Sequence, residues 1–300
     1  MDPNLVAKIA QIASVLEVSG HPKPGNVHRT QDFEDMVFED FLISGVAIGD
    51  TVKEAAKRGL RYGDEELSQI NLGELIKKAV IETNRWVENN TNLGIIMLLI
   101  PISAASGSIE YFKDLREKTQ EIIRATTPQD AVDLYDAINV ADAGGMGERK
   151  ELDVSSQKAK EELMEKRINM FQVLDLSSSW DSLAYELTHR YPVSFEVGYP
   201  TFKNLKKEHG INRATVQTFL TILSTKEDTL ITRKYNNSVS EQVKADARII
   251  LDEGGILTEE GRALLFKFDQ DLMKNKYNPG TTADFTASSL MIALLEQHWY

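Results

Sequence analysis

The sequence NPGTTAD at residues 278–284 leads directly into an apolar stretch, residues 285–295. Its proline and glycine predict a tight turn, and the apolar stretch predicts a buried helix. Thr281 or Thr282 is the expected N-cap, with Asp284 in the first helical turn, where a carboxylate stabilises free amides. Glycine lets a ligand approach the backbone, and unpaired N–H groups at a helix start attract phosphate. Taken alone, the turn is better explained as an ordinary helix cap, so other polar turns must decide whether it belongs to a site.

The rest of the chain also reads as helices. Asp2 and Pro3 are expected as the N-cap and first residue of a helix that ends at Gly20. Apolar periodicity predicts further helices over residues 35–58, 72–87, 131–140, 156–174, 181–190, 195–209, 212–223, 243–251, 259–274 and 282–297. Pro101 is expected to kink the apolar helix after Gly94 or to start a new one. We therefore predict an all-α fold: one domain spanning residues 1–300, a multi-helix bundle whose polar Gly-, Asn- and Thr-containing turns form a central cleft.

Composition limits the classes of function. The 300 residues are 42% hydrophobic and 27% charged, as in an ordinary soluble globular protein. The net charge of −12 argues against nucleic acid as a partner, and a polyphosphate ligand would need local cations, backbone amides or a metal. The sequence has no cysteine, which excludes disulfides and thiolate chemistry. No apolar stretch is long enough to cross a bilayer and no signal-type segment is seen, so we expect no membrane association and a cytoplasmic location.

A stiff polar loop follows the first helix, with the sequence HPKPGNVHR at residues 21–29. Two prolines hold Lys23 in extended backbone next to Gly25. A fixed lysine beside glycine and asparagine can bind an anion, and a plain connection between helices explains the loop equally well.

Acidic residues open the next predicted helix. Asp35 and Glu39 are expected one turn apart on one face, a spacing that can hold Mg²⁺ through oxygen ligands. Carboxylates near a helix start also stabilise the helix dipole without any ligand, which is the simpler interpretation.

Three further turns carry polar residues. Asn90 and Thr91 lie in an asparagine-rich turn, more polar than a helix cap requires, and Gly144 and Gly145 lie in a glycine-rich turn that is weak evidence for a phosphate loop. In the segment 226–234, an Asp–Arg pair is most often a salt bridge, but a ligand role is open. The five histidines show no metal-binding helix spacing.

Six motifs, taken in order, resemble one family over essentially the whole chain: triphosphoribosyl-dephospho-CoA synthase. They are Pro22-Lys23-Pro24-Gly25; Asp35-Met36 with Phe41 and Ser44; Asn90-Thr91 with Gly94; Gly144-Gly145-Met146-Gly147 with Asp153-Val154; Asp228-Thr229-Leu230-Ile231 with Arg233-Lys234; and residues 278–284. The resemblance implies an all-α transferase that joins the triphosphoribosyl part of ATP to the 2′-hydroxyl of dephospho-CoA and releases adenine.

The resemblance also implies roles for individual residues. The catalytic candidates are Asp35, Asp228 and Asp284, as Mg²⁺ ligands or as the base on the attacking hydroxyl. Mg²⁺ would be bound by Asp35, Glu39 and Asp228. The nucleotide would be bound by Lys23, Gly25, Asn90, Thr91, Gly144, Gly145, Arg233, Lys234, Asn278, Gly280, Thr281 and Thr282, with the basic pair and the amides of residues 280–282 holding the triphosphate.

Some positions depart from the family pattern. Asn92-Leu93 stands where the family usually has His-Lys, Phe33 where it has His, and Ala143 where it has Pro. The acceptor therefore stays open. We expect a phosphorylated acceptor with ATP as substrate, and leave a homodimer open. One alternative is a ribose-phosphate transferase or hydrolase acting on another cofactor precursor, for example in methanopterin synthesis. The other is a non-catalytic nucleotide-binding protein.

Overall fold

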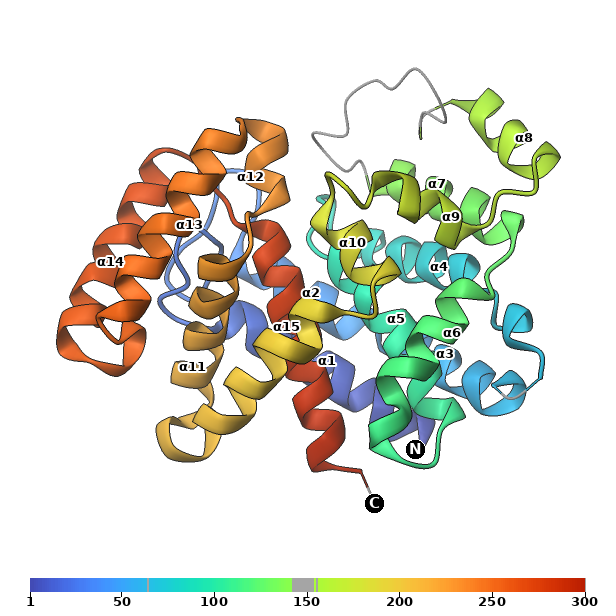
Figure 1. Cartoon of the computed structure of the whole chain (residues 1–300), viewed down its shortest axis with the longest axis horizontal. Coiled ribbons are helices and arrows are strands. Elements are labelled where there is room, and N and C mark those ends of the chain that lie inside the picture. Colours follow the sequence, from blue (N-terminus) through green and yellow to red (C-terminus); the bar gives the residue numbers. More distant parts are fainter. Residues whose placement is uncertain (64, 142–153, 155, 300) are drawn as a thin grey trace. The chain divides into compact units, whose positions relative to one another are not determined.

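The computed structural model describes residues 1–63, 65–141, 154 and 156–299. Helices make up the secondary structure of this part of the chain, which contains no β-strand, so the predicted all-α fold is confirmed (Figure 1). The chain divides into two compact units. Unit 1 comprises Met1–Ile12, Ile43–Tyr191 and Leu295–Tyr300, and unit 2 comprises Ala13–Leu42 and Pro192–Leu294.

Three helices contribute residues to both units: α1 (Pro3–Ser19), α2 (Phe38–Ala47) and α15 (Gly280–Gln297). The other elements of unit 1 are α3 (Gly49–Tyr62), η1 (Leu67–Ile70), α4 (Leu72–Asn84), α5 (Leu93–Ser108), η2 (Phe112–Asp114), α6 (Leu115–Arg124), α7 (Pro128–Val140), α8 (Gln157–Glu165), α9 (Met170–Ser177) and α10 (Ser182–Thr188). The other elements of unit 2 are the π-helix η3 (Val193–Gly198), α11 (Tyr199–Thr225), α12 (Thr229–Lys234), α13 (Asn237–Asp252), η4 (Gly255–Leu257) and α14 (Glu259–Lys274).

Helix α5 forms the centre of unit 1. Nearly all of its side chains are buried, and its sequence is apolar on every face, as expected for a helix enclosed by others. The helix continues through Pro101, so the expectation of a new segment there is wrong.

Two glycines allow α5 to lie close against α3. A Cβ on Gly107 would lie 2.0 Å from the carbonyl oxygen of Ala56, and a Cβ on Gly59 would lie 1.9 Å from that of Ala104. Each glycine therefore faces the backbone of the other helix, and larger residues would push the helices apart.

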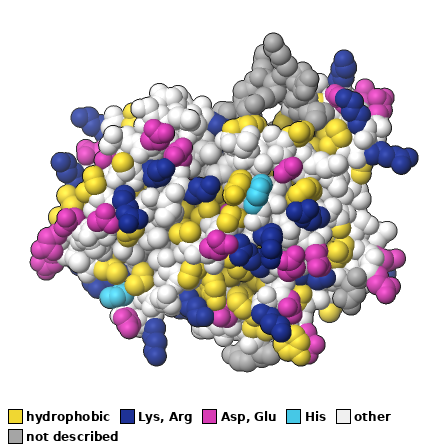
Figure 2. Space-filling view, in the orientation of Figure 1, with side chains coloured by type: hydrophobic (Ala, Val, Ile, Leu, Met, Phe, Trp, Pro, Cys, Tyr) yellow, Lys and Arg dark blue, Asp and Glu magenta, His cyan; other side chains and the backbone are white. Residues whose placement is uncertain are grey.

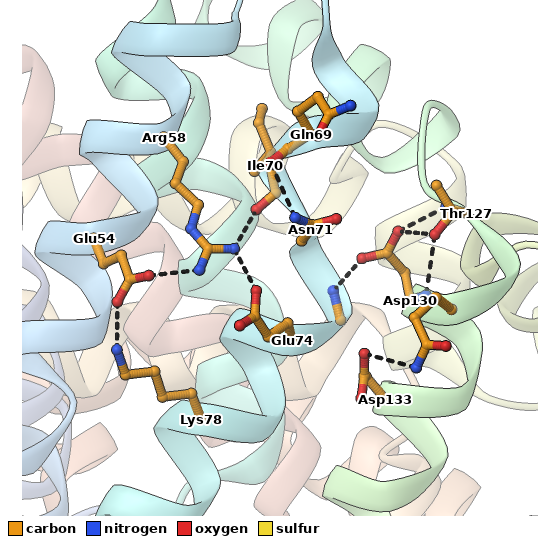
Figure 3. A network of polar contacts seen from close by, with 12 residues as sticks. Glu54, Arg58, Gln69, Ile70, Asn71, Glu74, Lys78, Thr127, Asp130 and Asp133 are labelled. Atoms are coloured by element: carbon orange, nitrogen blue, oxygen red, sulfur yellow. Dashed lines mark hydrogen bonds and ion pairs between the residues drawn. The ribbon is translucent and has the colours of Figure 1, made fainter.

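A polar network fixes the start of α4 in unit 1 (Figure 3). Asp130, in the first turn of α7, completes a capping box with Thr127 and also accepts a hydrogen bond from the N–H of Gly73, at 2.8 Å. Arg58 donates to the carbonyl of Ile70 and pairs with Glu74 at 2.6 Å. Thr127, Pro128 and Asp130 form a helix-start signal that is local in the sequence, and α7 begins there, three residues before the predicted helix 131–140.

Core packing in unit 2 brings α11, α13 and α14 together. Their buried apolar side chains form one cluster that includes Phe219, Val243, Leu265 and, at the start of α15, Ala283. Helix α11 has a non-helical residue at Gly210, with φ +75°, close to the break expected between residues 209 and 212.

Acidic and basic side chains are interspersed on the face of each unit shown in Figure 2. In the described part of the chain, no helix is both long and apolar enough to cross a membrane.

We predict that Gly107→Ala lowers the free energy of unfolding by about 1–3 kcal/mol, because the added methyl group overlaps the α3 backbone. Leu60→Ala, on the same helix pair but with a side chain 65% exposed, should change it by less than about 0.5 kcal/mol. Urea unfolding followed by circular dichroism measures both. Equal effects of the two substitutions would contradict the close helix contact.

Candidate functional site

The start of α15 is held by a carboxylate from a distant part of unit 2. Oδ2 of Asp228 accepts hydrogen bonds from the N–H of Thr282 at 2.7 Å and from its hydroxyl at 2.8 Å. Oδ1 of the same residue accepts from the N–H groups of Leu230 and Ile231, at 3.0 and 3.3 Å, and so caps α12. One buried side chain, 2% exposed, thus caps two helices.

This arrangement corrects the predicted roles of the turn. Helix α15 begins at Gly280, so neither Thr281 nor Thr282 is its N-cap and Asp284 lies beyond its first turn. The N–H of Gly280 donates to Asn278 O and that of Thr282 to Asp228, so the expectation of unpaired amides at residues 280–282 is wrong for both. The reason is physical: the Asp228 carboxylate supplies inside the protein the negative charge that a phosphate would otherwise bring.

Both oxygens of Asp228 are engaged with these four donors. Burial raises the pKa of its carboxyl group above the ordinary value, and the hydrogen bonds from Thr282, Ile231 and Leu230 oppose that rise. In this conformation Asp228 connects two helices, and a role as base or metal ligand would require it to release them.

The proline-flanked loop after α1 meets the same region of unit 2. Gly25 has φ +69°, and a Cβ there would lie 2.5 Å from the carbonyl oxygen of Tyr277, so the position requires glycine. Its N–H donates to Oδ1 of Asp269 at 2.9 Å. Asn26 Nδ2 donates to Oδ1 of Asn278 at 2.8 Å, which joins the first polar turn of the sequence to the last.

Lys23 lies inside unit 2. Its side chain is 0% exposed and pairs at 2.5 Å with Glu17, which is 2% exposed. Burial lowers the pKa of the Lys23 ammonium group, opposed by the negative charges of Glu17 and Asp284, and burial raises the pKa of Glu17, opposed by Lys23. The expected phosphate contact is therefore not available to Lys23 in this conformation, because the lysine is fully covered.

A second buried polar contact in the same loop, made by His28, was not predicted from the sequence. His28, 2% exposed, places Nε2 3.2 Å from Oδ2 of Asp269, which is 5% exposed. Its Nδ1 faces the hydroxyl of Thr30 and Nδ1 of His21, at 3.3 and 3.4 Å. The two histidines flanking the Pro-Lys-Pro-Gly motif could have drawn attention, but Asp269 follows His28 by 241 residues and has no local signal.

The other acidic and basic candidates of unit 2 lie nearer the surface. Asp35 is exposed in a bend before α2, and Glu39 is exposed in the first turn of that helix. They do not share a helix face as predicted, because the helix begins only at Phe38. Arg233 is half-buried and Lys234 exposed at the end of α12. Among the described residues, no three His, Asp or Glu side chains are placed to hold a metal ion.

The remaining candidates lie elsewhere. Asn90 and Thr91 belong to unit 1, where Asn90 Oδ1 accepts from the N–H of Leu93 at 3.2 Å and Thr91 Oγ1 lies 2.5 Å from Ser44 Oγ. Asn90 therefore fixes the turn before α5, and Thr91 connects that turn to α2. Gly144 and Gly145 lie outside the described residues.

Unit 1 also has a pocket of about 360 Å³. Its lining residues are Lys57, Arg58, Arg61, Tyr62, Gln69 and Asn71. Arg58 is already paired with Glu54 and Glu74, which reduces the positive charge that the pocket offers to an anion.

Comparison with known proteins gives consistent results. The model of the family CitG: ATP:dephospho-CoA triphosphoribosyl transferase matches residues 3–300. Proteins named as probable 2-(5''-triphosphoribosyl)-3'-dephosphocoenzyme-A synthases are similar. Those from Streptococcus pyogenes serotype M5 and Streptococcus equi are 22% and 24% identical and align with 97% of this chain and with 97% and 96% of their own lengths. One from Pseudomonas fluorescens is 30% identical over 112 residues, 37% of this chain and 38% of that protein.

A solved structure supports the same relationship. The crystal structure of an Archaeoglobus fulgidus protein, assigned by name as a triphosphoribosyl-dephospho-CoA synthase, superposes with a TM-score of 0.65 at 26% sequence identity. The match covers 88% of this chain and 100% of that one.

We predict that Lys23→Met destabilises the protein by about 3–5 kcal/mol, because it leaves the buried Glu17 carboxylate without its partner. The double variant Lys23→Met/Glu17→Met should be more stable than Lys23→Met alone, since no uncompensated charge then remains. Urea unfolding of Lys23→Met, Glu17→Met and the double variant measures the coupling between the two side chains.

Arg248→Met is the control for this cycle. It breaks a surface pair whose side chains are 59% and 62% exposed, and should cost less than about 1 kcal/mol. A Lys23→Met variant as stable as this control would contradict the buried pair.

Proposed function

The chain belongs to the ATP:dephospho-CoA triphosphoribosyl transferase family, a family of ATP-using transferases, and on this basis we propose that it transfers the triphosphoribosyl group of ATP to the 2′-hydroxyl of dephospho-CoA with release of adenine. The observation that carries the proposal is the family match over residues 3–300. The relatives that align over 97% of this chain bear names for the same reaction.

We place the reaction in unit 2, where three of the six motifs meet. The Lys23 loop contacts the turn before α15 through Asn26 and Asn278, and the turn before α12 contacts α15 through Asp228 and Thr282. Segments separated by 252 and 54 residues thus form one polar cluster. Such convergence supports a ligand site more strongly than any single turn does.

The triphosphate requires positive charge in a protein whose net charge is −12. Arg233 and Lys234, at the surface end of α12, are the basic residues proposed for this purpose. Lys23 instead keeps the loop in place through its pair with Glu17.

Mg²⁺ fits this site as a companion of ATP. Mg²⁺ usually retains several waters and binds through substrate phosphates and one or two carboxylates, so it does not need a group of three acidic ligands. Asp35 and Glu39 are exposed and Asp284 is partly buried, and these carboxylates would be the ones to hold it. The ion would supply positive charge against the phosphates.

The nearby carboxylates would also stabilise positive charge that develops on the ribose during the reaction. Cleavage of the bond between ribose and adenine passes through an oxocarbenium-like state, which a negative charge stabilises. Asp284 is the best-placed candidate, because it lies near the cluster and acts electrostatically on the buried Lys23. Asp228 would contribute by fixing the start of α15, the helix that carries Asp284.

Incubation of the protein with ATP, Mg²⁺ and dephospho-CoA tests the proposal, with chromatography for adenine and mass spectrometry for the joined product. We expect equal amounts of both. ATP binding without adenine release would favour an acceptor other than dephospho-CoA. The departures from the family pattern at Phe33 and Asn92 are the sequence argument for such an acceptor. Binding with no turnover on any acceptor would favour a non-catalytic protein.

Light scattering after size-exclusion chromatography distinguishes a homodimer from a monomer. The cytoplasmic location stays an expectation.

We predict that Arg233→Ala/Lys234→Ala raises KM for ATP by about 10- to 100-fold, the loss expected when charge-assisted hydrogen bonds to phosphate are removed. Arg248→Ala, in the same unit and paired with Asp252 on the surface, is the control and should leave KM unchanged. Steady-state kinetics at varied ATP gives both values. An unchanged KM in the double variant would place the triphosphate elsewhere.

A further inference from the structure

A line of polar side chains in unit 2 runs from a buried carboxylate to a partly exposed histidine. Asp269 Oδ2 lies 3.2 Å from Nε2 of His28, and both side chains are almost fully buried. Thr30 Oγ1 lies 3.3 Å from Nδ1 of His28 and 3.2 Å from Nδ1 of His21. The two histidine Nδ1 atoms are 3.4 Å apart.

The carboxylate favours one arrangement of protons along this line. An ionised carboxylate only accepts hydrogen bonds, so Nε2 of His28 must be the donor. With His28 neutral, its Nδ1 is an acceptor, and the group that faces it must donate. Nδ1–H of His21 meets this requirement, either directly or through the Thr30 hydroxyl. Nε2 of His21 then carries a lone pair.

His21 is held firmly by its backbone. Its N–H donates to Oδ1 of Asn212 at 3.0 Å, and Nδ2 of Asn212 donates back to its carbonyl at 2.8 Å. The ring of Phe266 packs edge-on at 5.7 Å. Within the described part of the chain, Nε2 of His21 has no hydrogen-bond partner. The ring is therefore positioned, with one nitrogen available.

The surroundings of His21 favour its neutral form. Burial is the main cause that lowers the pKa of His21 below its ordinary value, and the neighbouring His28 ring and Arg29 guanidinium act in the same direction. Asp269 opposes them. Because the result is a lowered pKa, His21 is neutral at pH 7 and able to accept a proton.

We propose that Nε2 of His21 is the general base for the acceptor hydroxyl, and that Asp269, His28 and Thr30 are positioning residues that keep the required tautomer. The inference rests on the proposed function. The hydroxyl oxygen bonds to C1′ of the ATP ribose while the bond from C1′ to adenine N9 breaks. Adenine leaves with that electron pair, the hydroxyl proton passes to His21, and the proton is then returned to the departing adenine, so that no net proton is consumed.

His21→Ala tests the base directly. We expect kcat to fall by about 10²- to 10⁴-fold, with KM for ATP changed little, and added imidazole to restore part of the activity. In the wild type, kcat/KM should fall as pH drops through the lowered pKa of His21, and this acid limb should vanish in the variant. His209→Ala, a histidine of the same unit outside this line, is the control and should keep the wild-type rate and profile.

Asp269→Asn tests the positioning residues without removing a ring. The amide N–H of the new asparagine would face Nε2 of His28, which must then accept, so that Nδ1 of His28 carries the proton and donates. Nδ1 of His21 then becomes the acceptor, and Nε2 of His21 acquires the proton. We expect a loss of kcat of at least about 10²-fold in a folded protein. Nitrogen-15 spectra of the histidine rings should show His21 protonated on Nδ1 in the wild type and on Nε2 in the variant.

The outcomes separate the two proposals. A wild type that releases no adenine overturns the proposed function, and the base assignment with it. An active wild type whose His21→Ala variant keeps its turnover and its acid limb overturns the base assignment alone. Spectra that show His21 protonated on Nε2 in the wild type also overturn it.

Discussion

The carboxylate of Asp228 is the contact on which the arrangement of unit 2 depends. It is almost fully buried, yet its charge is balanced by four donors, three of them backbone N–H groups at the starts of two helices. The dipoles of α12 and α15 add to this stabilisation because both helices present their positive ends to the same group. A neutral side chain could not satisfy both helices, so one ionised residue sets where each begins.

The loop after α1 is held by a different device. Asp269 accepts from the N–H of Gly25, from Gln31 and from His28, so one side chain of α14 gathers three points of the loop. The side chain of Lys23, in the same loop, is fully buried and pairs with Glu17. Buried charges in unit 2 therefore fix backbone segments that have no regular secondary structure.

Much of the fold could be predicted from local signals. The helix starts at Pro3 and at Pro128 were readable because a capping residue and a proline stand next to each other in the sequence. The helical class followed from apolar periodicity along most of the chain. The bend at Asp35 was not predicted, and the helix starts instead at Phe38, whose N–H donates to Oδ1 of Asp32. The passage of α5 through Pro101 was one of the two expected alternatives, and the burial of this helix on all sides accompanies it.

The site was less predictable than the fold. Three of the six motifs meet in unit 2, but the motifs did not indicate what each side chain does there. Sequence could not show that Lys23 is fully covered or that the amide of Thr282 already has an acceptor 54 residues away. Burial and long-range pairing decide whether a polar residue binds a ligand or holds the chain together, and neither is written in the neighbouring residues.

Unit 2 is built from two separate segments of the chain, and this affects how it folds during synthesis. Its first segment, Ala13–Leu42, is synthesised long before its second, Pro192–Leu294. His28 and Gly25 must therefore leave the ribosome without the Asp269 carboxylate that will hold them, whereas the Glu17–Lys23 pair is only six residues apart and can form early. Closure of this unit waits for almost the entire polypeptide, and contacts of such long sequence separation are the slow steps of folding.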